Sequence, residues 1–368
     1  MSDDPRRPCR DRPRATAGGH GARRLPVNGR AYTLDEVRRQ TAALPHDLPV
    51  LSEAARADAE RAVRWTGPAG RVVLLGSGDS LFAAQASLPS FTGAGVGCVA
   101  MSATEFQTEY QHADGVRTVV VGVSASGGNP AVVAALHQAR GDGRATVAVT
   151  GHPDSPVALA AGTSVVADPG PCAPSPGIRT HQASLLSLLH LAQALGGTST
   201  APVDVAGLAR AQHQTIALAE ASAGEVAGLL APAPVVWVVA AAGALGTARY
   251  LAAKLTETAG VPAFAVEPEE WWHVHRFGHD AAHPVLFLLT PGPGRAAALE
   301  TARRTAERRR LVVVAEHGDD QARAAATAVV PVADGATGAA RPLLDAVVAG
   351  PLALALARAL GRLPFARR

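Results

Sequence analysis

A short turn rich in hydroxyl and amide side chains is the clearest candidate for a ligand site. It reads Ser124-Ala-Ser-Gly-Gly-Asn-Pro130 and connects an apolar run to an Ala-rich stretch that is typical of a helix. Unpaired N–H groups and the positive end of the helix dipole favour an anion at such a position. Gly127 and Gly128 let the backbone approach a ligand closely, and Pro130 suits the first helical turn. We therefore expect an anion here.

The chemistry of this turn favours a monophosphate. Two hydroxyls and one amide can surround a phosphate through hydrogen bonds, but the turn contains no Lys or Arg. It also lacks the GK[ST] element of a P-loop, which makes ATP a poor match. The alternative interpretation is a helix cap made of Ser and Gly that binds no ligand.

A dense group of histidines forms a second candidate region. Its members are His273, His275, His279, Asp280 and His283. Two histidines at i,i+2 on a strand could chelate a metal, but the segment has no thiolate and no HExxH, and Arg276 lies within it. We expect no metal and no other cofactor. The adjacent Trp271-Trp272 pair either stacks on a ligand or anchors a helix.

Composition indicates two folded domains in a reducing compartment. The chain has 368 residues, of which 48% are hydrophobic, and this suits two cores of ordinary size. No run approaches 18 uninterrupted apolar residues, and the N-terminus lacks an apolar secretory segment. The three cysteines are widely spaced and form no CxxC pattern, so neither disulfides nor a zinc site is indicated. We expect a cytoplasmic protein with no membrane contact.

Charge is unevenly distributed along the chain. Residues 1–30 contain eight Arg and three Asp, whereas the net charge of the whole chain is only +3. The remainder is therefore slightly acidic, and nucleic acid is not an expected partner. We expect the Pro/Gly/Arg-rich segment 1–30 to be a disordered tail. Lys254 is the only lysine in the chain.

The elements that must position these residues follow an alternating pattern. Residues 34–44 and 51–65 read as two amphipathic helices, the first stopped by Pro45. Short apolar, β-branched runs then alternate with helical stretches, as in buried parallel strands. In the first half these runs are RVVLL (71–75), VGCVAM (96–101), TVVVGVS (118–124), ATVAVT (145–150) and TSVVA (163–167). A long apolar helix over about 178–196 ends this half.

The second half repeats the plan. Its strand-like runs are PVVWVVA (234–240), PAFAV (262–266), VLFLLT (285–290), LVVVAE (311–316) and AVVPVA (328–333). The turn that corresponds to Ser124–Pro130 is Thr290-Pro-Gly-Pro-Gly294, which keeps glycines but loses most hydroxyls. This asymmetry favours a functional first copy.

The repeated pattern predicts an α/β protein with two tandem, doubly wound (flavodoxin-like) parallel sheets. The alternative is one large Rossmann-like sheet. The predicted organisation is a tail (1–30), N-terminal helices (31–70), a first domain that binds the ligand (71–197), a linker helix (198–233) and a second, catalytic domain (234–368).

The ordered motifs resemble the sugar isomerase (SIS) domain. Gly78-Asp-Ser80, Ser124-x-Ser-Gly-x-Asn and His152-Pro-Asp-Ser-Pro156 match in the first half. In the second half, residues 253–260 (AKLTETAG) and 269–273 (EEWWH) resemble the KLKE and E-x-x-H-G-P stretches of the isomerase part of glutamine:fructose-6-phosphate amidotransferase. Fructosamine-phosphate deglycases and aminosugar-phosphate isomerases are also similar. The likeness spans about residues 35–360 and implies two tandem SIS domains.

The resemblance implies how a sugar phosphate is held. The residues carried over to the phosphate are Ser124, Ala125, Ser126, Gly127 and Asn129, the last standing where the family has Thr. Ser80 would add a hydroxyl, and Ser175 matches the serine of the family's S-T-K stretch, with Pro176 and Gly177 in place of the other two residues. Asp79 stands where Thr is common. Because a carboxylate repels phosphate, we expect Asp79 to contact a sugar hydroxyl or an amine, or else to cap the helix that begins at residue 80.

The resemblance also implies the catalytic groups. Glu257 matches the carboxylate that moves a proton between C1 and C2, and we expect the C-terminal end of its helix (247–259) to raise its pKa. Lys254 could pair with it, or the two could form a surface ion pair. His273 matches the histidine that opens the sugar ring and reaches a neighbouring subunit's site, although Val274-His275 replaces Gly-Pro. Glu270 would support His273 if the segment is helical.

The implied function is a phosphosugar or aminosugar-phosphate isomerase, deaminase or deglycase that acts through an enediol or enolamine in a homodimer with shared sites. The segment before residue 31 is too short for a glutaminase domain, and residues 355–368 contain no lysine for a Schiff base. We therefore do not expect glutamine-dependent amination. The alternatives are a non-catalytic phosphosugar-binding protein and an enzyme that acts on a non-phosphorylated sugar.

Overall fold

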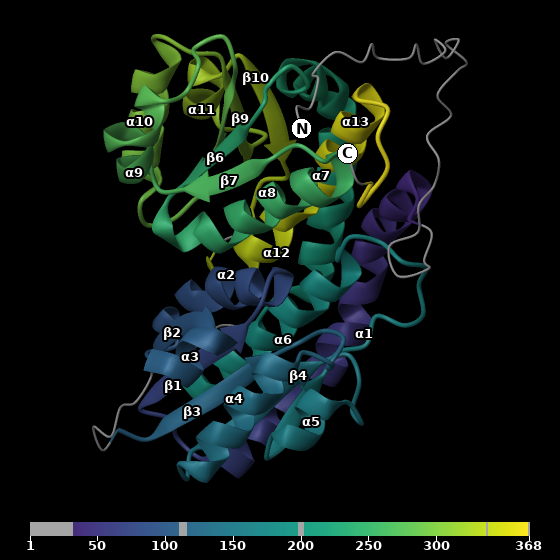
Figure 1. The fold of residues 1–368 in the computed structure, drawn as a ribbon, viewed down its shortest axis with the longest axis vertical. Helices are drawn as coiled ribbons and strands as arrows, with labels where there is room; N and C mark the ends of the chain where they lie inside the picture. Colours follow the sequence, from purple (N-terminus) through teal and green to yellow (C-terminus); the bar gives the residue numbers. More distant parts are fainter. Residues whose placement is uncertain (1–31, 110–115, 198–201, 336–337, 367–368) are drawn as a thin grey trace, which may run out of the picture.

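The protein is built around two separate parallel sheets in a computed structural model that describes residues 32–109, 116–197, 202–335 and 338–366 (Figure 1). The tail predicted over residues 1–30 lies outside the described residues. The two sheets confirm the predicted fold class of two tandem α/β units, and the alternative of one large sheet is wrong.

The first sheet has the order β2-β1-β3-β4-β5, with every neighbouring pair parallel. Its strands are β1 (Arg71–Gly76), β2 (Gly97–Ser102), β3 (Thr118–Val123), β4 (Ala145–Thr150) and β5 (Thr163–Val166). The three central strands are almost entirely buried, because helices cover both faces of the sheet. This burial explains their continuous Val-rich runs.

The second sheet has the order β10-β9-β8-β6-β7, so its five strands follow the same sequential plan as the first sheet. Its strands are β6 (Val236–Ala240), β7 (Ala263–Val266), β8 (Val285–Leu288), β9 (Leu311–Glu316) and β10 (Ala328–Val332). All ten predicted strands are present to within two residues at each end. In both sheets the order of the strands reverses between the first and third strands of the half, which is where open α/β sheets bind ligands.

Helices separate the strands in both halves. The first half contains α2 (Asp79–Gly93), α3 (Ala103–Glu109), α4 (Pro130–Gly141), α5 (Pro156–Ala160) and α6 (Arg179–Gly196). The second contains α7 (Val205–Leu230), η2 (Ala242–Ala244), α8 (Leu245–Ala259), α9 (Pro268–His273), η3 (His275–Phe277), α10 (Arg295–Ala306), α11 (Asp320–Ala325), η4 (Gly338–Ala340), α12 (Arg341–Asp345), η5 (Ala346–Val348) and α13 (Ala349–Ala359).

The N-terminal region corrects one prediction. In place of two helices, a single helix α1 (Leu34–Thr66) continues through Pro45 and Pro49. A proline inside a helix costs about 3 kcal/mol because it removes a hydrogen bond and crowds the preceding turn. Leu44, Leu48 and Leu51 are buried on either side of these prolines. Burial of each leucine contributes about 2 kcal/mol, and Val37, Ala55, Ala59 and Ala62 of the same helix are buried as well. Packing of this face against the rest of the protein therefore outweighs the penalty of the two prolines.

Helices of the two halves pack directly against each other. α2 of the first half contacts α8 of the second, and α1 contacts α6, α7 and α13. Figure 1 shows α2 and α8 between the two sheets. One continuous hydrophobic cluster includes Leu74 of β1 in the first sheet and Val238 of β6 in the second. Side chains from both halves can therefore meet at one site.

Two further helices bear on the sequence-based expectations. The segment 198–233, predicted as a linker helix, contains α7, which packs on β10 and α13 of the second half. The stretch Gly338–Ala359 is long and apolar enough to cross a membrane, but 83% of it is buried inside the protein, as in a core helix.

Candidate functional site

The hydroxyl-rich turn lies at the carboxyl edge of the first sheet. β1 and β3 are parallel neighbours, about 4.8 Å apart. The Asp79 turn after β1 and the Ser124 turn after β3 therefore start side by side. Ser124 is buried and Ser126 is exposed. Ser80, in the first turn of α2, is half-buried. The structure thus brings together the residues that were predicted to hold phosphate on these two loops.

Asn129 and Gly127 shape this turn. Asn129 is the N-cap of α4, and its Oδ1 accepts hydrogen bonds from the backbone N–H groups of Ala131 and Val132 at 3.0 and 3.3 Å. The cap of α4 is therefore Asn129 and not a serine or glycine, and the Nδ2 group of Asn129 takes no part in the cap. Gly127 has φ +66°, and a Cβ there would lie 2.1 Å from Ser155 Oγ. The turn thus requires glycine at this position.

A three-residue charge cluster joins the two halves at the Asp79 turn. Lys254 Nζ lies 2.7 Å from Asp79 Oδ2 and 2.5 Å from Glu257 Oε2. The lysine side chain is 1% exposed, whereas the carboxylate side chains are 24% and 29% exposed. Asp79 belongs to α2 and the other two residues to α8, so the cluster forms only because these helices pack together. It is not the surface ion pair that was the alternative for Lys254 and Glu257.

Asp79 does not cap α2. Gly78 is the N-cap residue and provides no side-chain hydrogen bond, while Asp79 is the first helical residue. Its carboxylate points to Lys254 instead. The capping interpretation of Asp79 is therefore wrong.

The pKa of Glu257 is raised above its ordinary value. Burial is the main cause, Lys254 opposes it, and the nearby charge of Asp79 adds to it. The pKa of Glu257 is therefore raised, as expected from the sequence, but the main cause is burial and not the dipole at the end of the helix. Arg362 Nη1 donates to the carbonyls of Ala259 and Gly260 at 2.9 and 3.1 Å, and a cation there compensates the negative end of a helix dipole.

Three residues that the sequence did not single out complete this region. His181 stacks on Tyr250, with centroids 3.7 Å apart, and its Nδ1 lies 3.2 Å from the main-chain oxygen of Asp79. Tyr250 Oη donates to the carbonyl of Gly177 at 3.2 Å. A Cβ on Gly177 would lie 2.5 Å from Asp79 Oδ2, so only glycine lets the loop approach this closely. The only signal in the sequence was a histidine at the start of an otherwise apolar helix.

His273 and Glu270 lie elsewhere in the second half. His273 is 69% exposed and its Nε2 is 3.2 Å from Glu269. Glu270 lies in the same short helix α9, but its nearest partner is His275 at 3.4 Å. No contact joins His273 to the Lys254 cluster among the described residues. Any role for His273 at that cluster stays a prediction that needs a second copy of the chain.

The tryptophans and histidines of this segment have structural contacts. Trp271 is fully buried, and its Nε1 donates to Thr305 Oγ1 at 3.1 Å, so it anchors α9 to α10. Trp272 lies between the guanidinium groups of Arg276 and Arg304, at 4.1 and 3.8 Å from its ring. Within the part of the chain that the structure describes, no three His, Cys, Asp or Glu residues are placed to hold a metal ion.

Two cavities lie beside the candidate site. One cavity has a volume of about 400 Å³ and lies between the ends of β4 and β5 and the first turns of α6. Ala125 and the loop Ala167–Cys172 also line it. The other, of about 490 Å³, is open between α1 and the same loop. Both are walled by Pro171 and Cys172. Neither of these two cavities is lined by Ser124, Ser126 or Glu257.

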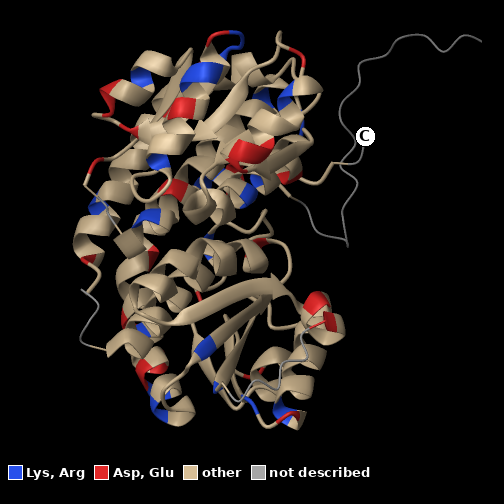
Figure 2. Cartoon of the chain, turned by 90° about the vertical axis from the view of Figure 1, so that its left-hand side faces the viewer, with Lys and Arg blue, Asp and Glu red and all other residues tan. Residues whose placement is uncertain are grey.

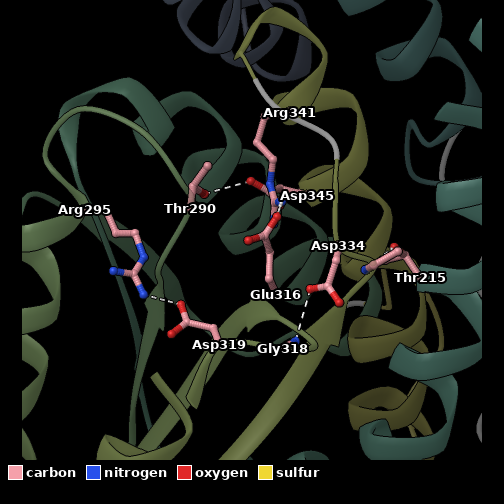
Figure 3. Close-up of polar contacts among 10 residues, drawn as sticks. Thr215, Thr290, Arg295, Glu316, Gly318, Asp319, Asp334, Arg341 and Asp345 are labelled. Carbon is pink, nitrogen blue, oxygen red and sulfur yellow. Dashed lines mark hydrogen bonds and ion pairs between the residues drawn. The ribbon is translucent and has the colours of Figure 1, made fainter. Parts of the chain in front are cut away.

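The carboxyl edge of the second sheet carries a different polar network (Figure 3). Arg341 donates to Glu316 and to Asp345, both at 2.7 Å, and Thr290 Oγ1 donates to the other oxygen of Asp345 at 2.7 Å. Burial raises the pKa of Asp345, against the opposing effects of Arg341 and Thr290. A separate ion pair joins Arg295, at the start of α10, to Asp319, the N-cap of α11.

In the view of Figure 2, positions of Lys and Arg and positions of Asp and Glu are interspersed along both halves of the chain.

Comparisons with known proteins agree with the observed fold. The family model of the SIS domain matches residues 68–194. The C-terminal domain of glucosamine-fructose-6-phosphate aminotransferase from Francisella tularensis superimposes with a TM-score of 0.75 at 15% identity, covering 89% of this chain and 96% of that one. Tagatose-6-phosphate ketose/aldose isomerase from Escherichia coli gives 0.72 at 18% identity, covering 90% and 93%.

A local sequence match points to one more relative. Over 53 residues the chain is 55% identical to N-acetylmuramic acid 6-phosphate etherase from Symbiobacterium thermophilum. The match covers 14% of this chain and 18% of the etherase, so the chain spans less than a fifth of that protein. The SIS family model thus matches one segment of the chain, residues 68–194, and the chain as a whole shares the fold of the two solved structures named above.

Proposed function

We propose that this protein is an enzyme that transfers a proton between neighbouring carbons of a phosphorylated sugar or aminosugar, as an isomerase, deaminase or deglycase. The observation that supports it most strongly is that Lys254 joins the Glu257 carboxylate to Asp79, which follows β1 at the carboxyl edge of the first sheet. A carboxylate with a raised pKa is suited to act as a general base on a C–H next to a carbonyl.

The proposed reaction proceeds through an enediol or an enolamine. The phosphate binds at Ser124, Ser126, the amide N–H of Asn129 Nδ2 and the backbone of Ala125 and Gly127. Glu257 removes a proton from one carbon and returns it to its neighbour. Lys254, which lies within hydrogen-bond distance of both carboxylates, stabilises the negative charge that develops on the oxygen or nitrogen of the intermediate. We propose a homodimer, in which His273 of one copy opens the sugar ring at the other copy's site.

The test is Glu257→Gln, which keeps the hydrogen bond to Lys254 but removes the base. We expect turnover on a panel of aminosugar and fructosamine phosphates to fall about 10²- to 10⁴-fold, with loss of deuterium incorporation at C1 and C2. The matched control is Glu316→Gln at the other sheet, which should retain turnover. Wild-type turnover by Glu257→Gln would refute the mechanism.

A second candidate function is phosphosugar binding without catalysis. The observation in its favour is the exposed position of His273, remote from the contacts of Glu257 within one chain. Saturable binding of a sugar phosphate without any hydrogen exchange at C1 or C2 would support this function over the first.

A further inference from the structure

The loops around Asp79 contain buried polar atoms that no described residue satisfies. These atoms are Asp79 Oδ1, His181 Nε2 and Ser175 Oγ. A buried polar group without a hydrogen bond is destabilising, and nearly all such groups in native proteins find a partner. The three atoms come from the start of α2, the first turn of α6 and the loop just before α6, which contact one another through Asp79, His181 and Gly177. Their grouping indicates that a ligand completes their hydrogen bonds.

The chemical types of these atoms define what the ligand must offer. Asp79 Oδ1 belongs to a carboxylate and can only accept. His181 Nδ1 faces a main-chain oxygen, which also only accepts, so Nδ1 carries the proton and Nε2 presents a lone pair. Burial lowers the pKa of His181 to about 4, so the ring is neutral. The Ser175 hydroxyl can serve either role. The ligand group must therefore donate several hydrogens.

The position of Asp79 Oδ1 is set by its surroundings. Oδ2 is committed to Lys254 at 2.7 Å, and the close approach of Gly177 leaves no space for a larger residue against it. The other oxygen is consequently left without a protein partner. His181 is only 2% exposed and is fixed by its stacking on Tyr250. The acceptors are thus pre-oriented.

Charge distinguishes this end of the site from the hydroxyl turn. Asp79, Glu257 and Lys254 together carry one net negative charge, and the nearby Arg179 is already paired with Asp47 through two hydrogen bonds at 2.6 and 2.7 Å. A phosphate is repelled here and finds donors at the Ser124 turn on the neighbouring strand. The two parts of the site therefore favour different groups of one ligand. The Ser124 turn favours an anion, and the Asp79 cluster favours a cation that donates hydrogen bonds.

We propose that Asp79, together with Ser175 and His181, binds the primary ammonium group of an aminosugar phosphate and selects it over the sugar that carries a hydroxyl at that carbon. An ammonium group offers three donors and a positive charge, whereas a hydroxyl offers one donor. Hydrogen bonds between charged partners are about twice as strong as neutral ones. This inference rests on the proposed function, because the phosphate end anchors the same ligand.

The experiment measures binding of three polyol phosphates that have no carbonyl and cannot be turned over. They are glucitol 6-phosphate, 1-amino-1-deoxyglucitol 6-phosphate and 2-amino-2-deoxyglucitol 6-phosphate, titrated calorimetrically into the full chain at pH 6.5. We expect at least one amino compound to bind about 10-fold more tightly than glucitol 6-phosphate. In Asp79→Asn the ratio should fall below about 3-fold, with little change in the affinity for glucitol 6-phosphate.

Controls separate the two ends of the site and the two proposals. Ser126→Ala should weaken all three ligands by the same factor. Asp79→Ser provides a second variant, and inorganic phosphate binding reports whether either variant is folded. Equal affinity of the wild type for all three compounds, or an unchanged preference in both Asp79 variants, overturns this inference alone. Failure of all three compounds and of inorganic phosphate to bind the wild type overturns the proposed function and this inference with it.

Discussion

Each of the two sheets has beside it a cluster of one cation and two carboxylates, and the two clusters differ in how many of their hydrogen bonds are satisfied. At the first sheet, Lys254 lies between Asp79 and Glu257. At the second, Arg341 lies between Glu316 and Asp345. Each cluster contains one cation and two carboxylates beside the carboxyl edge of a parallel sheet. The cation is fully buried in both, at 1% and 3% side-chain exposure.

The two clusters differ in whether the oxygens of their aspartate have hydrogen-bond partners within the protein. Thr290 Oγ1 donates a hydrogen bond to the second oxygen of Asp345, which is 2% exposed, and the planar guanidinium of Arg341 donates to Glu316 and Asp345. Asp79 is 24% exposed, close to the 25% of Glu316 in the other cluster, but one of its oxygens has no partner among the described residues. Identical strand order therefore yields one edge at which Asp345 has a donor for each oxygen and one at which Asp79 does not.

The largest expected contrast between the clusters is in stability. Asp345→Asn should lower the free energy of unfolding by about 3 kcal/mol, because Asp345 and Arg341 are both buried and the substitution breaks a buried ion pair. Asp79→Asn should cost at most about 1 kcal/mol, because Lys254 retains Glu257 and Asp79 is partly exposed. Urea denaturation at pH 7 measures both values. Equal losses would show that the two clusters play the same structural part.

A pH-dependent contrast should come from His181. Its pKa in the folded protein is lowered to about 4 from 6.5, mainly by burial. The unfolded chain therefore binds more protons between these values, so this contribution to stability is complete above pH 6.5 and is lost as the pH falls toward 4. The loss amounts to about 3 kcal/mol.

The variant His181→Phe isolates this contribution, because it keeps a ring that can stack on Tyr250. Denaturation series from pH 7 to pH 4 should show a smaller decline for His181→Phe than for the wild type. Parallel declines would mean that His181 is not the group responsible, and the matched variant His279→Phe then tests the other histidine whose pKa is lowered to about 4.

The smallest expected effect is a shift in the pH dependence of catalysis. Burial raises the pKa of Glu257, and the charge of Asp79 adds to this rise. The acidic limb of kcat/KM should therefore lie above the ordinary glutamate range and should move to lower pH in Asp79→Asn, by less than about one unit. A limb that stays in place would separate Asp79 from the base. As a control, Asp345→Asn should leave the limb unchanged.

Local pattern predicted most of the fold and part of the site. Val-rich runs such as 119–123 could be recognised as buried strands because both faces of a parallel strand are covered. The Ser124–Pro130 turn could be placed at a helix N-terminus from its Asn, Gly and Pro residues, whose conformational preferences act over one or two residues. The continuity of α1 could not be predicted, because burial by distant helices outweighs the preference of Pro45.

The sequence by itself thus determined two α/β units with parallel sheets and their order along the chain. It also determined that the hydroxyl-rich turn is present in only one of them. Tertiary structure alone decided that Asp79 meets Lys254 across 175 residues and that His181 stacks on Tyr250. It also decided that Arg341 closes the second edge. The physical reason is one of range, since backbone preferences and periodicity operate within a few residues. Charge pairing and hydrogen-bond satisfaction depend instead on which helices pack together.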